Sequence, residues 1–288
     1  MKQAILVGYA ALEYAVQLDG EFRGDWTVPI KHRHEHPWPR PGGCHFYAAQ
    51  PIAQAGGAPE LVSWIGEDEL GSVYRRYCEH HGIGTRGVVS VPGTTPLCFL
   101  VYQPDGSCGC LIDFGMSSRS AMTTAQENLI SGADLVCITV APAAAVARTL
   151  ELIRPQATVA WITKNDPVSF TPTVRRTLAQ RADVIFCNAR ERAWVDEVAT
   201  TRPVGQAIVQ TSGAGSVQVH QSGRVTELAV DAIAARDTTG AGDTLAGGTL
   251  ASLLAGETDL VIAARAGVNA AHTLLKNRID KLKGEGAC

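Results

Sequence analysis

The 288-residue sequence lacks the features that define several large classes of protein. No apolar run approaches the ~18 residues that a membrane-spanning helix needs, so we expect no membrane partner. The 25 Lys and Arg against 28 Asp and Glu give a net charge of −3, which argues against a nucleic-acid partner. Residues 1–10 carry no small-residue cleavage site after a long apolar core, so we expect no signal peptide and a cytoplasmic location.

The sequence also lacks a Cys-x-x-Cys motif, although it contains eight cysteines. Cys137 and Cys187 lie within apolar strand patterns, which predicts buried, reduced thiols rather than a disulfide framework. Cys108 and Cys110 alternate in another predicted strand. For that pair we expect packing or a dimer contact rather than metal binding.

The composition that remains suits one large folded domain, and we assign residues 1–288 to it. Apolar residues make up 45% and charged residues 18%, enough for a sizeable core. Short apolar runs alternate with helical patterns. The predicted strands are 4–7, 61–65, 135–140, 158–162, 184–187, 207–211 and 226–230, and the predicted helices are 46–54, 70–81, 143–153, 172–180, 190–198 and 244–255. This alternation predicts a three-layer α/β/α fold with a mostly parallel central sheet, which binds ligands beyond the strand C-termini.

Two segments interrupt the alternation. Residues 19–40 are polar and carry His32, His34 and His36, while residues 94–113 form a hairpin pattern around Asp105-Gly106. We predict that segments of about 15–40 and 94–115 form a small β lid. The alternating histidines could hold a metal, but a substrate-facing strand or a solvated lid edge is the favoured interpretation.

The most informative motif is Asp237-Thr238-Thr239-Gly240-Ala241-Gly242-Asp243, between a predicted strand and a predicted helix. Its glycines let the backbone turn tightly and present N–H groups, and the helix dipole adds positive potential, so the motif predicts an anion site. Asp243 is placed to accept a proton from a hydroxyl that attacks phosphorus. The alternative is an ordinary loop with an acidic first helical turn.

Two glycine-containing motifs precede helical patterns nearer the N-terminus. Gly42-Gly43 would let a substrate approach the backbone at a helix start, although a simple turn also explains it. The acidic residues within 66–71 are interpreted as a cap for the following helix.

Two further motifs follow predicted strands. Asn188 and Glu191 fit a capping box, and both could also support magnesium and phosphates, partly through water. The glycine-rich segment 211–216 is either a hairpin turn or a loop against which a nucleotide lies.

The order and spacing of these motifs resemble the ribokinase-like family of carbohydrate and nucleoside kinases, over roughly residues 3–275. The resemblance implies ATP and Mg²⁺ as cofactors, with Asp243 as general base and Gly240, Ala241 and Gly242 as the anion hole. It implies that Glu191 meets the magnesium through water. The implied nucleotide-binding residues are Asn188, Glu191, Ser212, Gly213, Gly215, Thr238, Thr239 and Asn269.

Three departures from the family pattern bear on the acceptor. Glu13 replaces the family's usual Asp, and Tyr47 replaces its usual Asn, so the assignment to ribose, fructose or adenosine is weakened. Residues 274–278 run into a charged tail where relatives have a potassium-binding loop, so dependence on a monovalent cation stays open. The candidate substrate-binding residues are Glu13, Gly42, Gly43, His45, Tyr47 and Asp243.

These observations together predict an ATP-dependent kinase that phosphorylates a hydroxyl of a small sugar, polyol or related carbohydrate. One alternative is a nucleoside kinase, which Tyr47 alone supports. Another is a non-catalytic ligand-binding protein on the same scaffold. Because exposed lid edges often pair, a homodimer through the lid is also expected.

Overall fold

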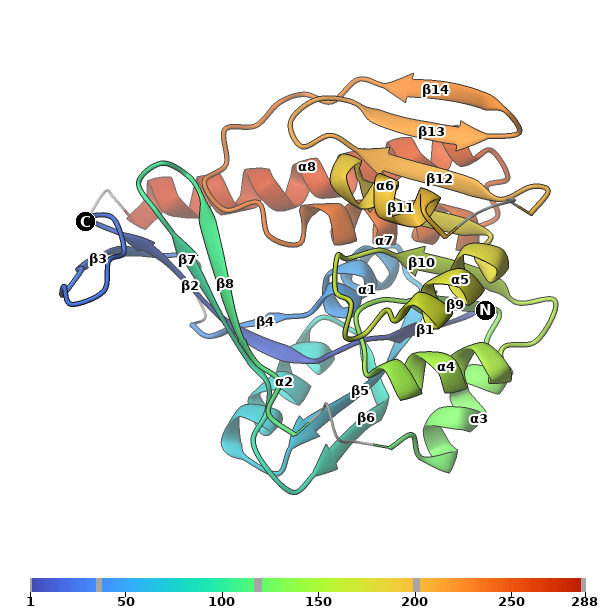
Figure 1. Cartoon of the computed structure of the whole chain (residues 1–288), viewed down its shortest axis with the longest axis horizontal. Helices are drawn as coiled ribbons and strands as arrows, with labels where there is room; N and C mark the ends of the chain where they lie inside the picture. Colours follow the sequence, from blue (N-terminus) through green and yellow to red (C-terminus); the bar gives the residue numbers. More distant parts are fainter. Residues whose placement is uncertain (1, 35–37, 117–120, 199–202, 286–288) are drawn as a thin grey trace.

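The computed structural model describes residues 2–34, 38–116, 121–198 and 203–285, and its central feature is a nine-stranded sheet (Figure 1). The strand order is β14-β13-β12-β11-β10-β9-β1-β5-β6. Pairing is parallel from β6 to β12, and β13 and β14 extend the sheet as antiparallel strands. These strands are β1 Gln3–Val7, β5 Ala58–Gly66, β6 Gly84–Val91, β9 Leu135–Ile138, β10 Thr158–Ile162, β11 Val184–Asn188, β12 Ala207–Thr211, β13 Val217–Gln221 and β14 Arg224–Leu228.

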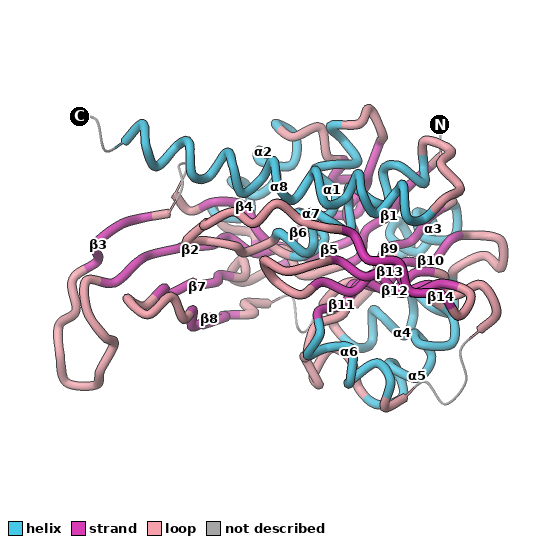
Figure 2. Tube along the Cα trace, turned by 90° about the horizontal axis from the view of Figure 1, so that it is seen from above, coloured by secondary structure: helices cyan, strands magenta, loops and turns pink. Residues whose placement is uncertain are grey.

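Helices cover both faces of this sheet because successive strand residues point to opposite sides. In β1, Ala4 and Leu6 belong to one buried cluster, and Ile5 and Val7 belong to the other. The first cluster includes α1 Cys44–Gln54, α2 Glu69–His80, α7 Ala241–Leu254 and α8 Leu260–Glu285. The second includes α3 Thr124–Gly132, α4 Ala143–Leu152, α5 Pro172–Arg181 and α6 Ala189–Asp196. Figure 2 shows α1 and α8 on one side and α4, α5 and α6 on the other, which confirms the predicted three layers.

A second sheet stands beside the first and is built from two separate parts of the chain (Figure 1). Its strands are β2 Ala11–Leu18, β3 Ile30–Arg33, β4 Arg40–Gly42, β7 Leu97–Tyr102 and β8 Cys108–Asp113. The predicted hairpin is confirmed, since β7 and β8 pair antiparallel and Gly106 donates to the carbonyl of Gln103. The parallel pairing of β2 with β7 joins the two parts. The sheet begins at Ala11, ahead of the predicted lid boundary.

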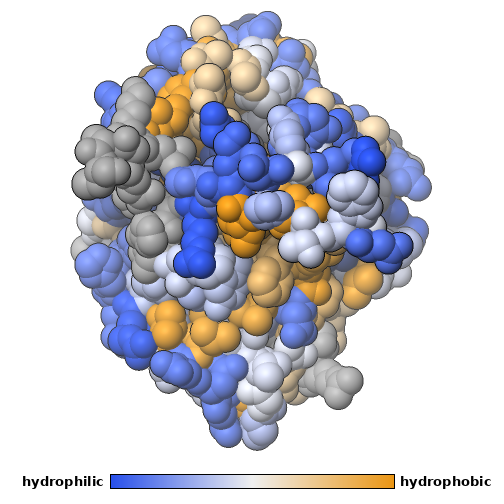
Figure 3. Space-filling view, turned by 90° about the vertical axis from the view of Figure 1, so that its left-hand side faces the viewer, coloured by the Kyte–Doolittle hydropathy of each residue, from blue (hydrophilic) through white to orange (hydrophobic). Residues whose placement is uncertain are grey.

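The edge strand β8 of this second sheet carries exposed apolar side chains. All residues of β8 are exposed, and Leu111 is 63% exposed. Apolar atoms interrupt the hydrophilic surface at this end of the molecule (Figure 3). The homodimer through the lid stays a prediction.

Several elements differ from the sequence-based expectation. The strand β6 and the helix α3 were not predicted, because β6 has no continuous apolar run and Thr123 caps α3 within a polar segment. More consequentially, α8 continues to Glu285. The segment 274–278, expected to lead into a tail, is therefore helical. Among the helices that the structure describes, none combines the length and apolarity needed to cross a bilayer.

Candidate active site

A cavity of about 570 Å³ lies between the C-terminal ends of the central strands and the second sheet. The second sheet contributes Glu13 and Leu100, while Lys164 and Asn188 come from the ends of β10 and β11. The helix α7 contributes Asp243 at its first turn. This placement beyond the strand C-termini matches the sequence-based expectation for ligand binding in parallel sheets.

Residues 238–243 of the segment 237–243 line this cavity. Gly240 caps α7 with a φ of 76°, in the left-handed region that glycine adopts readily. The first amides of a helix have no partner within it, and here the Ala241 N–H donates to Thr238 O at 3.2 Å. Asp243 is only 4% exposed, and its Oδ1 has no hydrogen-bond partner within the described part of the chain. A buried carboxylate oxygen thus faces the space where a ligand would lie.

Lys164 is a site residue that the sequence analysis missed. Its Nζ lies 3.5 Å from Asp243 Oδ1, and this carboxylate raises the pKa of the Lys164 ammonium, which burial alone would lower. The lysine therefore stays charged at neutral pH. Its position two residues beyond the strand 158–162 was the available signal, since side chains after parallel strands converge on the ligand.

Asn188 and Glu191 form the predicted capping box at the start of α6. Asn188 Oδ1 accepts from the Glu191 N–H at 2.9 Å, and Glu191 Oε2 accepts from the Asn188 N–H at 2.9 Å. The same Oε2 accepts from Thr163 Oγ1 at 2.9 Å. Both residues line the cavity, so a structural role and contact with a bound group are compatible.

The predicted nucleotide loop is a tight hairpin between β12 and β13. Ser212 and Gly215 close the turn, with the Gly215 N–H 3.1 Å from Ser212 O, and neither lines the cavity. Gly213, Thr238 and Thr239 do line it.

The predicted nucleotide-binding residue on α8 lies beside the cavity lining. Asn269 is exposed and does not line the cavity, whereas Val268 and His272 do. Because side chains on a helix repeat about every 3.6 residues, the face that meets the cavity depends on how α8 packs. The role of Asn269 stays a prediction, and His272 is a further candidate on the same helix.

The two substituted acceptor positions, Glu13 and Tyr47, contact each other. Tyr47 Oη donates to Glu13 Oε2 at 2.7 Å, and Arg40 Nε donates to the same oxygen at 2.8 Å. Both residues line the cavity and both are nearly buried. Burial raises the pKa of Glu13, and Arg40 opposes this rise. The Glu13 carboxylate therefore already accepts hydrogen bonds from side chains of the protein itself.

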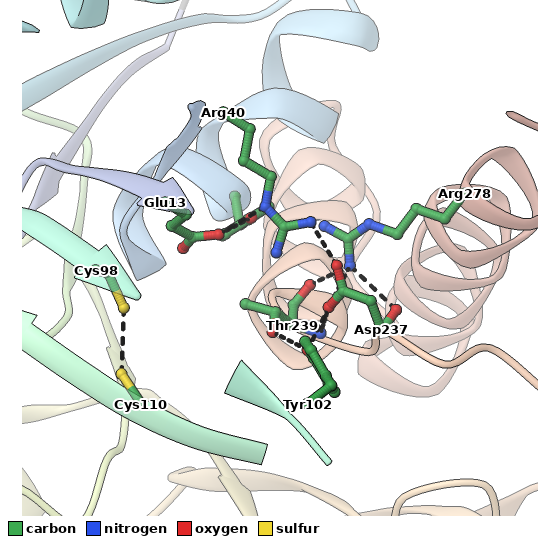
Figure 4. A network of polar contacts seen from close by, with 9 residues as sticks. Glu13, Arg40, Cys98, Tyr102, Cys110, Asp237, Thr239 and Arg278 are labelled. Atoms are coloured by element: carbon green, nitrogen blue, oxygen red, sulfur yellow. Dashed lines mark hydrogen bonds and ion pairs between the residues drawn. The ribbon is translucent and has the colours of Figure 1, made fainter. Parts of the chain in front are cut away.

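Asp237 is the centre of a second polar cluster, shown in Figure 4. Its carboxylate pairs with Arg40, accepts from Tyr102 Oη at 2.5 Å, and lies 3.6 Å from Arg278 Nη1. Tyr102 Oη is also 2.8 Å from Thr239 Oγ1. Burial tends to raise the pKa of Asp237, but Arg40 and Arg278 outweigh burial and hold it well below its usual range.

The predicted contact between His45 and substrate finds no support in its placement. His45 is fully buried, its Nε2 lies 3.4 Å from Tyr74 Oη, and it does not line the cavity. Gly42 and Gly43 do not line the cavity either. A Cβ on Gly42 would collide with the Glu13 side chain, and Gly43 has a φ of 94°. The glycine pair lets the protein's own groups approach closely, and its contact with a substrate stays a prediction.

Where the structure describes them, the remaining histidines and cysteines form no group suited to a metal ion. No group of three potential metal ligands gathers within the described ranges. His34 is buried against Tyr102, and His36 lies outside the described residues. Cys137 and Cys187 are buried, as predicted. Cys110 reaches across to Cys98, with the two Sγ atoms 3.2 Å apart.

This architecture is the ribokinase-like fold, as solved structures show. The nucleoside kinase of Methanocaldococcus jannaschii superposes with a TM-score of 0.80 at 18% identity, covering 96% of this chain and 92% of that one. The ribokinase of Thermotoga maritima gives 0.76 at 18% identity, covering 94% and 92%. The ribokinase of Cryptococcus neoformans in complex with ADP gives 0.76 at 21% identity, covering 94% and 93%.

Sequence comparison narrows the class to one family. Residues 5–278 match the pfkB family of carbohydrate kinases, and the chain belongs to that family. None of the curated proteins matches the sequence significantly. The resemblance inferred from the motifs is therefore confirmed at the level of fold and family.

Proposed function

We propose that this protein transfers the γ-phosphoryl group of ATP to a hydroxyl of a small sugar, polyol or related carbohydrate. The observation that carries the proposal is Asp243, whose buried Oδ1 faces the cavity at the first turn of α7 without a hydrogen-bond partner in the described structure. A carboxylate in this position is suited to accept the proton of an attacking hydroxyl.

Charge stabilisation comes from two further parts of the site. The first turn of α7 directs partial positive charge and backbone amides towards the cavity, which suits the oxygens of a phosphoryl group. Lys164 adds a full positive charge 3.5 Å from Asp243. Phosphoryl transfer depends mainly on alignment and charge stabilisation, so Gly240, Ala241 and Gly242 with Lys164 are proposed to hold the phosphoryl group in line.

The opposite end of the cavity is proposed to hold the nucleotide, with Gly213, Thr238, Thr239 and His272 along it. Glu191 suits a magnesium ion held through water, because its Oε2 already accepts two hydrogen bonds while its carboxylate lines the cavity. Magnesium, when bound, neutralises phosphate charge. Asn188 contributes by fixing the orientation of Glu191.

A nucleoside kinase is the second candidate, and the fold similarity to the M. jannaschii nucleoside kinase favours it. Tyr47 does not strengthen it. Gly240 packs closely against the Tyr47 ring, since an added Cβ would lie 2.6 Å from it, and the Arg278 guanidinium lies 5.8 Å from the ring centroid. These neighbours reduce the ring surface on which a base could stack.

The deciding experiment is a coupled ADP-release assay with MgATP and a panel of sugars, polyols, sugar acids and nucleosides. We expect turnover with at least one acceptor, and a loss of about 100-fold or more in kcat for Asp243→Asn, which removes the base but keeps the shape. Asp280→Asn, an exposed position on α8, serves as the matched control. An Asp243→Asn variant with the wild-type rate would exclude Asp243 as the base, and ATP binding without turnover would favour a non-catalytic protein.

A further inference from the structure

Five buried side chains, one of which is Asp237 itself, form a closed ring beside the rest of the segment 237–243. Glu13 contacts Arg40 and Tyr47 through Oε2 at 2.8 and 2.7 Å, and Arg40 pairs with Asp237. Arg278 closes the ring, since its guanidinium lies against Asp237 and 5.8 Å from the centroid of the Tyr47 ring. Glu13 lies on β2, Arg40 on β4, Tyr47 on α1, Asp237 in the segment itself and Arg278 on α8. The ring therefore ties the acceptor end of the cavity to the last helix.

Arg278 makes the most direct contacts with the backbone of the segment. Its Nη1 donates to Thr239 O at 2.6 Å and lies 3.4 Å from Asp237 O and 3.6 Å from Asp237 Oδ1 (Figure 4). Two main-chain carbonyls and one carboxylate of the same segment thus converge on one cation. Arg278 itself is only 4% exposed, so water does not replace these contacts.

Converging oxygen atoms repel one another unless a cation lies among them, and carbonyls with carboxylates are the donor set that hard metal cations use. Here a guanidinium occupies that place. It is always charged, and its planar fork can reach several acceptors. The positive charge beneath the segment is therefore part of the chain.

The carbonyl contacts also set the direction of two amides. In a trans peptide unit the C=O and the following N–H point in opposite directions. Holding Thr239 O towards Arg278 directs the Gly240 N–H away from α8, and holding Asp237 O does the same for the Thr238 N–H. Gly240 and Thr238 both line the cavity.

We propose that Arg278 is the built-in cation of the segment 237–243, a positioning residue that orients its amides for the transferring phosphoryl group. The proposal rests on the proposed kinase function. It has a direct consequence: phosphoryl transfer by this protein needs no added monovalent cation, because Arg278 supplies the charge permanently.

The test compares wild type, Arg278→Ala, Arg278→Lys and the control Lys276→Ala in potassium, sodium and tetramethylammonium salts. Lys276 is exposed on the same helix, so its removal deletes a charge without touching the segment. We expect equal wild-type rates, within about twofold, in all three salts. Arg278→Ala should lose about 10- to 100-fold in kcat, as expected for a misplaced phosphoryl-binding group. Low-millimolar guanidinium should restore part of that rate, and Arg278→Lys should be intermediate.

Three results would overturn the proposal. The first is a wild-type enzyme that requires potassium, and the second is an Arg278→Ala variant whose kcat equals that of the control. The third is a loss of kcat in Arg278→Ala that no added cation restores, although the melting temperature of the variant is unchanged. If Arg278→Ala does not fold, Arg278→Lys carries the test, because it keeps a charge but loses the fork. A folded Arg278→Lys variant should then be slower than wild type in all three salts, and wild-type kcat in it would also count against the proposal.

Binding of a non-hydrolysable ATP analogue, which keeps the γ-phosphoryl group, separates this proposal from the proposed function. If no acceptor is phosphorylated, the kinase assignment fails, but calorimetry with this analogue and Mg²⁺ still reports on Arg278. The proposal expects the same wild-type affinity in potassium and tetramethylammonium, weaker binding by Arg278→Ala, and recovery with guanidinium. Equal affinities for wild type and Arg278→Ala would refute it.

Discussion

The imidazole of His45 fills the space left by two glycines. An added Cβ on Gly8 would lie 2.7 Å from the ring, and one on Gly43 would lie 3.1 Å from it. Burial lowers the pKa of His45 to about 3. The residue therefore stays neutral in the folded protein over the whole physiological range of pH.

This buried histidine predicts a specific dependence of stability on pH. An unfolded histidine has a pKa of about 6.5, so the unfolded chain binds a proton that the folded protein does not. The contribution is fully present above pH 6.5 and is lost as the pH falls towards the folded pKa. We expect the free energy of unfolding to drop by about 1 kcal/mol between pH 7 and pH 5.5 because of His45.

Urea unfolding at the two pH values checks this expectation. His45→Gln should remove that part of the drop, whatever its effect on absolute stability. An identical drop in wild type and His45→Gln would show that the imidazole titrates normally in the folded protein.

At the scale of elements, α7 is defined by small residues that let its neighbours approach. A Cβ on Gly247 would collide with the backbone carbonyl of Ala48 in α1, and one on Gly248 would lie 2.8 Å from Ala270 in α8. Close packing on both sides holds α7 in place, and with it Asp243 in its first turn.

Gly247→Ala tests this packing. We expect it to lower the free energy of unfolding by about 2 kcal/mol, because the added methyl group must push α1 away from α7. Gly242→Ala is the matched control for stability, since nothing lies within 4 Å of its added Cβ and its effect should stay within about 0.5 kcal/mol. Urea denaturation of both variants gives the comparison, and equal midpoints would contradict the contact.

At the scale of the whole molecule, the cavity is shared by the central sheet and the second sheet. A kinase must exclude water during transfer, or ATP would be hydrolysed. We predict that the second sheet closes over the cavity, and its loop around Phe22 and Trp26 is strongly exposed.

Limited trypsin digestion can detect such closure. We expect a non-hydrolysable ATP analogue together with the acceptor to slow cleavage at Arg23, in the exposed loop, by several-fold. Cleavage at Arg224, the exposed first residue of β14, should change little and serves as the internal reference. Unchanged cleavage at Arg23 with both ligands would argue against closure.

Local features could be predicted from the sequence because they depend on residues a few positions apart. The capping box of Asn188 and Glu191, the β7–β8 turn and the helix that begins after Gly240 are all set by contacts between near neighbours. The apolar strand runs likewise predicted the parallel sheet. Fold class and the position of Asp243 followed from these patterns alone.

The tertiary structure decided which distant residues meet. Asp237 joins Arg40 across 197 positions and Arg278 across 41, and no short-range pattern encodes such pairs. The departures at Glu13, at Tyr47 and near the C-terminus lie far apart in the sequence, yet side chains from all three places belong to one ring beside the segment 237–243. Side chains far apart in the chain contact one another only when packing brings their elements together. For this reason Lys164, His272 and Arg278 were identified from the tertiary structure and not from the sequence.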